Sequence, residues 1–202
     1  MIRKYVFGHP FETEAVVEKI APSEGVPAYG EIKADGEFVV SYKMDTDDIV
    51  SGLGESNRGI NKRGYRYVSN CTDEPNHTES KYSLYGAHNF IIVFGKETFG
   101  LFLDYPGIME FDIGYTRQDE LKVRCGDADL DLYVIDGESP YDIVKQFRKI
   151  IGVSYIPPKF AFGFGQSRWG YKTAEDFRNV VKEYRDNHIP MDMLYMDIDY
   201  ME

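Results

Sequence analysis

Phe160-Ala-Phe-Gly-Phe-Gly-Gln166 is an apolar, aromatic run that lies between two prolines and the sequence Arg168-Trp169-Gly170. Its length and composition predict a buried β-strand. A helix is expected next, because Thr173 can cap a first turn together with Asp176 three positions later. The apolar stripe of this helix is expected to pack inward and comprises Phe177, Val180, Val181 and Tyr184.

A second strand is predicted at residues 191–198, which are apolar on both faces except at the ends. This pattern is typical of a strand that helices cover on both sides of a parallel sheet. Residues 160–198 therefore predict a β-α-β unit, which we interpret as the opening of a (β/α)8 barrel. In such barrels the C-terminal ends of the strands carry the chemistry. Those ends hold Gln166, Arg168 and Trp169 on one strand, and Asp197 and Asp199 on the next.

These aromatic and polar side chains predict a sugar-binding pocket. A sugar ring stacks on an aromatic face, while carboxylates accept hydrogen bonds from its hydroxyl groups. Acidic residues after a strand also occur as solvated loop residues or helix caps, and that alternative stays open for Asp197 and Asp199.

Two motif blocks resemble glycoside hydrolase family 31, the α-glucosidases and their relatives. The first is Ser51-Gly-Leu-Gly-Glu55, followed by Asn61-Lys-Arg-Gly64. The second is Phe164-Gly-Gln-Ser-Arg-Trp-Gly-Tyr171, followed downstream by Ile189-Pro-Met-Asp-Met-Leu-Tyr-Met-Asp-Ile-Asp-Tyr-Met201. The resemblance places the first block in the family's N-terminal β-domain and the second at the start of its catalytic barrel.

The resemblance implies hydrolysis of terminal α-linked glucose from oligosaccharides by a retaining mechanism with two carboxyl groups. Both catalytic aspartates are expected on later barrel strands, so no catalytic residue is assigned in this chain. Asp197 is expected to accept hydrogen bonds from glucosyl hydroxyls, Trp169 to wall the pocket and Ile198 to line its floor. Asp199 is a further substrate-binding candidate, with the alternative that it holds neighbouring loops.

A long polar loop at residues 68–80 shows no strand pattern. Loops of this length are either mobile surface or part of a site. In the family that the chain resembles, the corresponding loop reaches over the barrel mouth and helps to form the leaving-group subsite. Asp73 is therefore predicted to contact the substrate, with a solvated surface aspartate as the alternative.

Three regions are predicted along the chain. Residues 1–135 show short strands with turn punctuation, which predicts an N-terminal β-sandwich. Residues 136–158 are expected to form a helix and linker, with Ser139 as the N-cap and Pro140 in the first turn. Residues 159–202 are the predicted start of the barrel. Because a complete barrel needs about 250 residues, the chain is expected to be the N-terminal portion of a longer protein.

Two other motifs imitate ligand sites but fail their requirements. The glycine-rich residues 51–64 lack the Walker spacing and predict a structural loop, whose basic residues could pair with acidic neighbours. Asp127-Ala-Asp-Leu-Asp131 imitates a calcium loop, yet its sixth position is Leu132 where the turn requires Gly. A half-buried strand is expected there instead, and we expect neither a metal nor a cofactor.

The formal net charge of −11 disfavours nucleic acid and anionic membrane as partners. No apolar run approaches the length of a membrane span or of a signal-peptide core. Cys71 and Cys125 are too few for a disulfide framework and predict free thiols in a reducing compartment. The expected location is cytoplasmic and the expected partner is an α-glucoside oligosaccharide. The oligomeric state, a homo-oligomer included, stays open.

Two alternatives to an α-glucosidase also stay open. A related α-glycosidase, such as an α-xylosidase or an α-galactosidase, would share the binding end of the pocket and differ around C5 and C6 of the sugar. The β-region could instead belong to a non-catalytic carbohydrate-binding domain. The sequence does not decide between α-1,4 and α-1,6 linkages.

Overall fold

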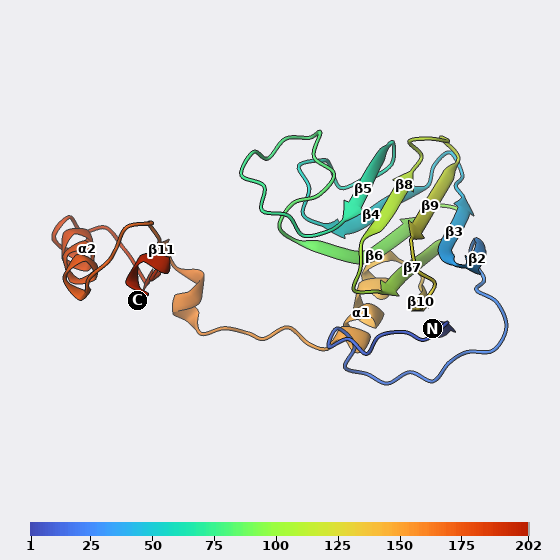
Figure 1. The fold of residues 1–202 in the computed structure, drawn as a ribbon, viewed down its shortest axis with the longest axis horizontal. Helices are drawn as coiled ribbons and strands as arrows, with labels where there is room; N and C mark the ends of the chain where they lie inside the picture. The colour runs from blue at the N-terminus through green and yellow to red at the C-terminus, as the bar shows by residue number, and fades with distance from the viewer. Residues whose placement is uncertain (202) are drawn as a thin grey trace. The chain divides into compact units, whose positions relative to one another are not determined.

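The computed structural model describes residues 1–201 and divides the chain into two compact units (Figure 1). The first unit ends at Val153 and the second begins at Ser154. The division lies inside the region predicted as helix and linker. Among the described residues, no helix combines the length and the apolar character that a membrane span requires.

The first unit is a β-sandwich, as predicted, built from two five-stranded antiparallel sheets. The first sheet has the order β1 (Ile2–Phe7), β10 (Leu130–Asp136), β7 (Thr98–Asp104), β6 (Ala87–Phe94) and β4 (Ile49–Gly54). The second sheet has the order β2 (Glu31–Asp35), β3 (Glu37–Lys43), β9 (Glu120–Cys125), β8 (Met109–Ile113) and β5 (Tyr65–Ser69). Strand β9 alternates between buried and exposed side chains, because one face packs on the core and the other meets solvent.

The main core lies between the two sheets. Its fully buried side chains include Phe38 and Val123 from the second sheet, and Phe99, Leu103 and Leu132 from the first. Both cysteines are free thiols, as predicted, with Cys125 buried and Cys71 exposed.

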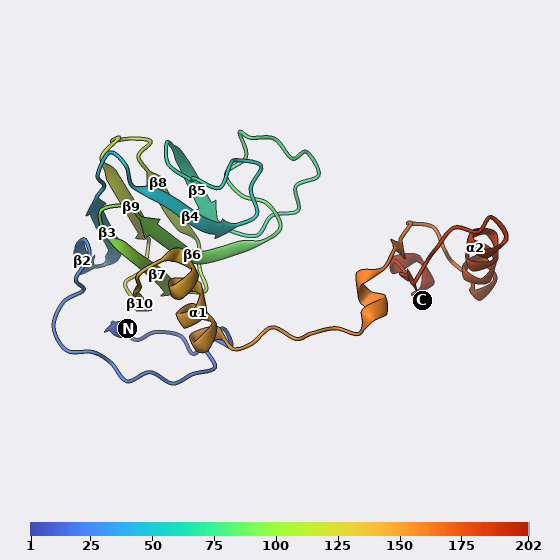
Figure 2. The same cartoon turned by 180° about the vertical axis from the view of Figure 1, so that it is seen from behind.

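A second, smaller core lies on the outer face of the first sheet, under helix α1 (Pro140–Ile151) (Figure 2). Ile143 and Ile150 of the helix are fully buried there, together with Ile135 of β10. Strand β10 is therefore buried on both faces, and the prediction of a half-buried strand was wrong. The alternating pattern could not reveal this, because the cover comes from a helix later in the chain.

The ends of α1 follow the predicted caps. The Ser139 side chain accepts a hydrogen bond from the backbone N–H of Asp142 at 3.2 Å, and Pro140 occupies the first turn. Gly152 ends the helix with a φ of 85°, a left-handed value that favours glycine.

The second unit contains the predicted order of strand, helix and strand, but both strands are short. β11 (Gly165–Gln166) pairs in parallel with β12 (Met193–Leu194). Between them, α2 (Ala174–Asp186) begins with the predicted capping box of Thr173 and Asp176 and has Asn187 as its C-cap. Its apolar stripe is half-buried, and no residue of the helix is fully buried.

The predicted extents of these strands were wrong. Lys159–Phe162 forms the 3-10 helix η1 after Pro158, and Ile198–Tyr200 forms the 3-10 helix η2. The side chains of Phe160 and Phe162 are 55% and 73% exposed, where a buried strand was expected. A strand persists only where it finds hydrogen-bonding neighbours, and among the described residues β11 and β12 pair only with each other.

Of the glycine-rich residues 51–64, residues 51–54 belong to β4, so the prediction of a loop was wrong for them, and residues 55–64 form the loop. The register of β4 on β6 shifts between Gly52 and Gly54. Gly52 has a φ of 123°, and a Cβ added to it would lie 2.2 Å from the Phe90 carbonyl oxygen. The basic residues of this loop bond to backbone carbonyls and a hydroxyl instead of the expected acidic side chains. Arg63, for example, donates to the carbonyl oxygens of Asp45 at 2.7 Å and of Gln118 at 3.0 Å.

The carboxylates of residues 127–131, the motif that imitates a calcium loop, bond to groups of the protein. The Asp127 carboxylate accepts from the N–H of Asp129, and the Asp129 carboxylate accepts from the N–H of His9. Asp131 pairs with Lys4 at 2.6 Å. Each carboxylate of the motif thus has a structural partner.

Candidate functional site

The candidate sugar site lies at one edge of the short parallel pair in the second unit. Gly165 is opposite Met193 and Gln166 is opposite Leu194, so both strands end at the same edge. Trp169 follows the end of β11 and Asp197 follows the end of β12. Because the ladder is parallel, the two predicted residues leave neighbouring strands in the same direction.

Trp169 is 72% exposed and lies beside Gly170, whose φ is 112°. In the part of the chain that the structure describes, no hydrogen bond or aromatic contact joins Trp169 to Asp197. An exposed indole of this kind offers a flat apolar face to a ligand.

The three predicted residues that follow β12 share one short turn. Asp197 is the N-cap of η2, and its Oδ1 accepts a hydrogen bond from the backbone N–H of Ile198 at 2.7 Å. The Ile198 side chain is 63% exposed. Asp199 is half-buried, and its Oδ2 has no hydrogen-bond partner among the described residues. One oxygen of Asp197 is therefore committed to the backbone, while Asp199 keeps an unused acceptor.

Gln166 is held in place at the same edge, although no binding role was predicted for it. Its side-chain Oε1 accepts from the Tyr184 hydroxyl at 2.5 Å, and its Nε2 donates to the Tyr171 hydroxyl at 3.3 Å. Tyr184 also stacks on Phe164, with 5.9 Å between the ring centroids. The sequence does show a polar residue at the end of an apolar strand, but its tyrosine partners lie on α2 and on the preceding turn.

Asp73 lies in the first unit, between β5 and β6. The loop predicted at residues 68–80 begins two residues later, because Val68 and Ser69 belong to β5. We call residues 70–86, between the two strands, the polar loop. Figure 1 shows this loop as a wide excursion beyond the end of β5. The Asp73 side chain is exposed, and its Oδ1 accepts a hydrogen bond from the Tyr85 hydroxyl at 2.7 Å. This bond to a carboxylate raises the pKa of Tyr85. The Tyr85 ring in turn meets the edge of His77 at 5.7 Å between centroids.

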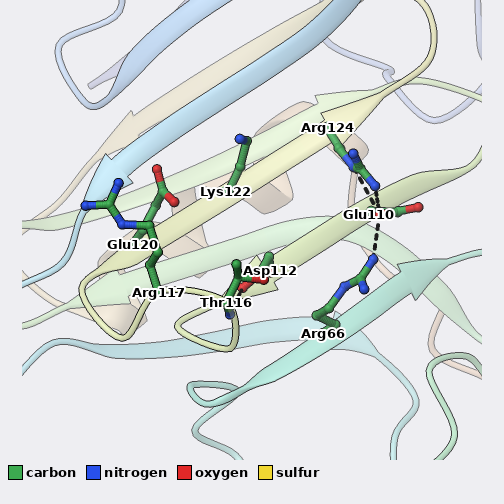
Figure 3. A pocket seen from close by; sticks show the side chains of 8 residues that line it. All are labelled: Arg66, Glu110, Asp112, Thr116, Arg117, Glu120, Lys122 and Arg124. Atoms are coloured by element: carbon green, nitrogen blue, oxygen red, sulfur yellow. Dashed lines mark hydrogen bonds and ion pairs between the residues drawn. The ribbon is translucent and has the colours of Figure 1, made fainter.

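A separate pocket lies on the outer face of the second sheet (Figure 3). Glu110 is its central group, because its Oε2 accepts from Arg66 at 3.0 Å and from Arg124 at 2.7 Å. The Arg124 hydrogen bond, with Arg66 adding to it, lowers the pKa of Glu110. None of the eight lining residues is aromatic, so the pocket offers no stacking face to a sugar ring. The side chains of its ion pairs are 35–50% exposed, and pairs that solvent screens in this way contribute about 0–1 kcal/mol to stability.

Comparison with protein families matches both units. Residues 10–112 match the model of the glycosyl hydrolase 31 N-terminal galactose mutarotase-like domain. Residues 154–202 match the model of the glycosyl hydrolases family 31 TIM-barrel domain. The second unit is therefore the start of a TIM-barrel domain, in agreement with the interpretation of the β-α-β pattern.

Known proteins similar to the chain include alpha-glucosidase 2 of Bacillus thermoamyloliquefaciens, with 32% identity over 82% of this chain and 21% of that protein. Human intestinal sucrase-isomaltase is 31% identical over 85% of this chain and 10% of its own length. Among solved structures, a family 31 dextranase of Flavobacterium johnsoniae in complex with isomaltotriose has a TM-score of 0.78 and 27% identity. It matches 85% of this chain and 21% of its own. The chain thus spans about a fifth or less of these relatives, and it belongs to glycosyl hydrolase family 31.

Proposed function

We propose that the chain is the N-terminal portion of an α-glucosidase that releases terminal α-linked glucose from oligosaccharides with retention of configuration. The observation that carries the proposal is the common edge of β11 and β12, from which Trp169 and Asp197 emerge. The names of the relatives support the substrate class, since they include α-glucosidases and a dextranase bound to isomaltotriose.

In this proposal the described residues bind and orient the terminal glucose. The free oxygen of Asp197 accepts hydrogen bonds from sugar hydroxyls, and Trp169 and Ile198 supply apolar walls. Asp199 offers a second carboxylate, and Asp73 contacts the leaving-group side. The nucleophile and the acid/base carboxyl, which in retaining enzymes lie about 5 Å apart, come from later barrel strands outside residues 1–202.

The test replaces Asp197 by alanine in the full-length protein. A hydrogen bond to a charged group is worth about 1.5–3 kcal/mol, and each 1.4 kcal/mol is a factor of about ten. Loss of two such bonds predicts a fall in kcat/KM on maltose of about a hundredfold or more, with an unchanged unfolding transition. Asp186→Ala is the matched control, because Asp186 lies at the exposed end of α2 and, within residues 1–201, pairs only with Lys182.

Two further readouts address the finer parts of the proposal. Retention predicts that NMR detects α-glucose before mutarotation, and β-glucose as the first product would refute it. Turnover of a p-nitrophenyl α-glucoside should exceed that of the matching α-xyloside, and the opposite order would favour the α-xylosidase alternative. Wild-type kinetics in Asp197→Ala would remove the proposed binding role of that carboxylate.

A further inference from the structure

The far part of the polar loop, residues 73–81, has very few bonds to the rest of the sandwich. The base of the loop is closed by backbone bonds from Val68 N–H to the Tyr82 carbonyl and from Thr72 N–H to the Leu84 carbonyl. Within the far part, Glu74 pairs with Lys81 and Asp73 accepts from Tyr85. All of these bonds beyond the base join residues of the same loop, so they shape it without fixing it to the sheets.

Arg58 supplies the exception. Its Nε donates to the carbonyl oxygen of Glu79 at 2.7 Å, and its Nη1 donates to the carbonyl oxygen of Arg66 at 2.7 Å. Glu79 lies in the far part of the loop, whereas Arg66 lies in β5. Among the described residues, the bond to Glu79 is the one hydrogen bond that ties residues 73–81 to anything outside the loop.

Three tyrosine rings surround the same guanidinium. Its central carbon lies 4.3 Å from the ring centroid of Tyr65, 4.9 Å from that of Tyr67 and 5.6 Å from that of Tyr82. Tyr65 and Tyr67 belong to β5 and Tyr82 to the loop, so the stacking joins the same two elements as the hydrogen bonds. A planar guanidinium group stacks its face on aromatic rings while its N–H groups donate in fixed directions within the plane, whereas an ammonium group is a compact point charge without a planar face.

The neighbouring cation does not duplicate this role. Lys62 is buried, its Nζ donates to the Ser56 hydroxyl at 2.8 Å, and it lies 5.8 Å from the Tyr67 centroid. Burial and then the charge of Arg58 lower the pKa of Lys62. Lys62 therefore packs near the Tyr67 ring, and the hydrogen bond to the far part of the polar loop comes from Arg58.

We propose that Arg58 is a positioning residue that fixes the far part of the polar loop and, through it, Asp73. Two short steps connect them: Glu79 is two residues from Lys81, and the Lys81 partner Glu74 is next to Asp73. The inference rests on the proposed function, because Asp73 has its substrate role only there.

Hydrogen exchange of the full-length protein tests the positioning directly. Arg58→Ala is expected to raise amide exchange in residues 73–81 about tenfold or more, because opening of the loop no longer breaks the Arg58 contacts. Arg58→Lys should recover only part of the protection, because it restores the charge and lacks the planar fork. Arg63→Ala is the control, because Arg63 lies in the same glycine-rich segment and bonds to carbonyls elsewhere. Unchanged exchange in Arg58→Ala, or equal exchange in Arg63→Ala, would overturn the inference.

Kinetics on maltotriose separate this inference from the proposed function. Arg58→Ala and Asp73→Ala should each raise KM several-fold with a smaller change in kcat, since a leaving-group contact contributes binding. The double variant should be no worse than Asp73→Ala alone. If Asp73→Ala is impaired and Arg58→Ala is not, the link between them is wrong. If Asp73→Ala has wild-type kinetics, the proposed role of Asp73 fails, while the exchange measurement still decides whether Arg58 holds the loop.

Discussion

An alanine at position 100 would place a methyl group in the contact between the first sheet and helix α1. Gly100 is buried in β7, and a Cβ built on it would lie 2.6 Å from Ile143 Cγ2 and 3.2 Å from Phe90 Cε2. Optimal carbon–carbon contacts are about 3.5–4.0 Å, so Ile143 or the helix must move. The φ of Gly100 is not left-handed, which makes the expected effect steric and independent of backbone strain.

The expected change in the free energy of unfolding can be worked out for variants of Gly100 and of Ile143, the two residues in contact. Overpacking of a core typically costs about 1–3 kcal/mol, which we expect for Gly100→Ala. Ile143 is fully buried, and Ile143→Ala should cost about 2–5 kcal/mol through the lost methyl groups and the cavity. In the double variant the added methyl enters the space that Ile143 has left. The double variant should therefore cost less than the sum of the single variants by about 0.5–3 kcal/mol.

Urea unfolding of the 202-residue chain, followed by tyrosine fluorescence, measures all three variants. Tyrosine is the suitable probe, because the single tryptophan, Trp169, lies in the second unit. The midpoints should shift without a change in the slope m. Gly126→Ala is the matched control, since an added Cβ meets nothing within 4 Å there, and it should stay within about 0.5 kcal/mol of wild type. Additive effects of Gly100→Ala and Ile143→Ala would refute the packing of α1 over Gly100.

Three further predictions concern single positions of the sandwich. Ser139→Ala removes the cap bond to the Asp142 N–H and should lower the unfolding free energy by about 0.5–2 kcal/mol in denaturant, whereas Ser139→Asp should retain stability. Burial raises the pKa of Asp104, whose carboxyl group accepts a hydrogen bond from the Thr13 hydroxyl. The stability that this carboxyl group contributes is therefore complete below its ordinary pKa of 3.8, and it is lost as the pH rises through the higher pKa of the folded state. Between pH 3 and 7, the urea midpoint of Asp104→Asn should therefore rise relative to that of the wild-type protein as the pH increases. Midpoints of the two proteins that change in parallel with pH would contradict this reasoning. Gly52→Ala combines a φ of 123° with a Cβ 2.2 Å from a carbonyl oxygen of β6, so thermal unfolding should show a loss of about 2–6 kcal/mol, and a wild-type midpoint would rule out this strain in β4.

Local features of the fold were predictable from the sequence because their causes lie within a few residues. The caps at Ser139 and Thr173 depend on a side chain and a backbone N–H three positions apart, and both form as predicted. The sandwich was predictable for a similar reason, since alternation along a strand reports which face meets the core. The family was predictable because the sequence around Gly52 and the sequence around Trp169 both resemble stretches of that family.

The burial of particular residues was not predictable, because it depends on what packs against them. The alternating pattern of β10 predicted one exposed face, and α1 covers that face. The aromatic run at residues 160–166 predicted a buried strand, yet it begins in a 3-10 helix, and its three phenylalanines are 49–73% exposed. In both segments burial depends on the neighbour that packs against the side chains, and composition alone cannot tell which neighbour that will be.

The candidate site also has features that the sequence predicted and features that it did not. The sequence by itself determined that Trp169 and Asp197 follow the ends of two strands of a β-α-β unit, because strand periodicity and helix caps are local properties. The cap that Asp197 forms on η2 is also local, and the sequence already offered it as an alternative. Only the tertiary structure decided that Gln166 is held by Tyr184 and that Arg58 joins the polar loop to β5. Both contacts join residues that are far apart in the sequence, Gln166 to the Tyr184 hydroxyl and Arg58 to the Glu79 carbonyl oxygen, and such partners leave no periodic trace in the order of amino acids.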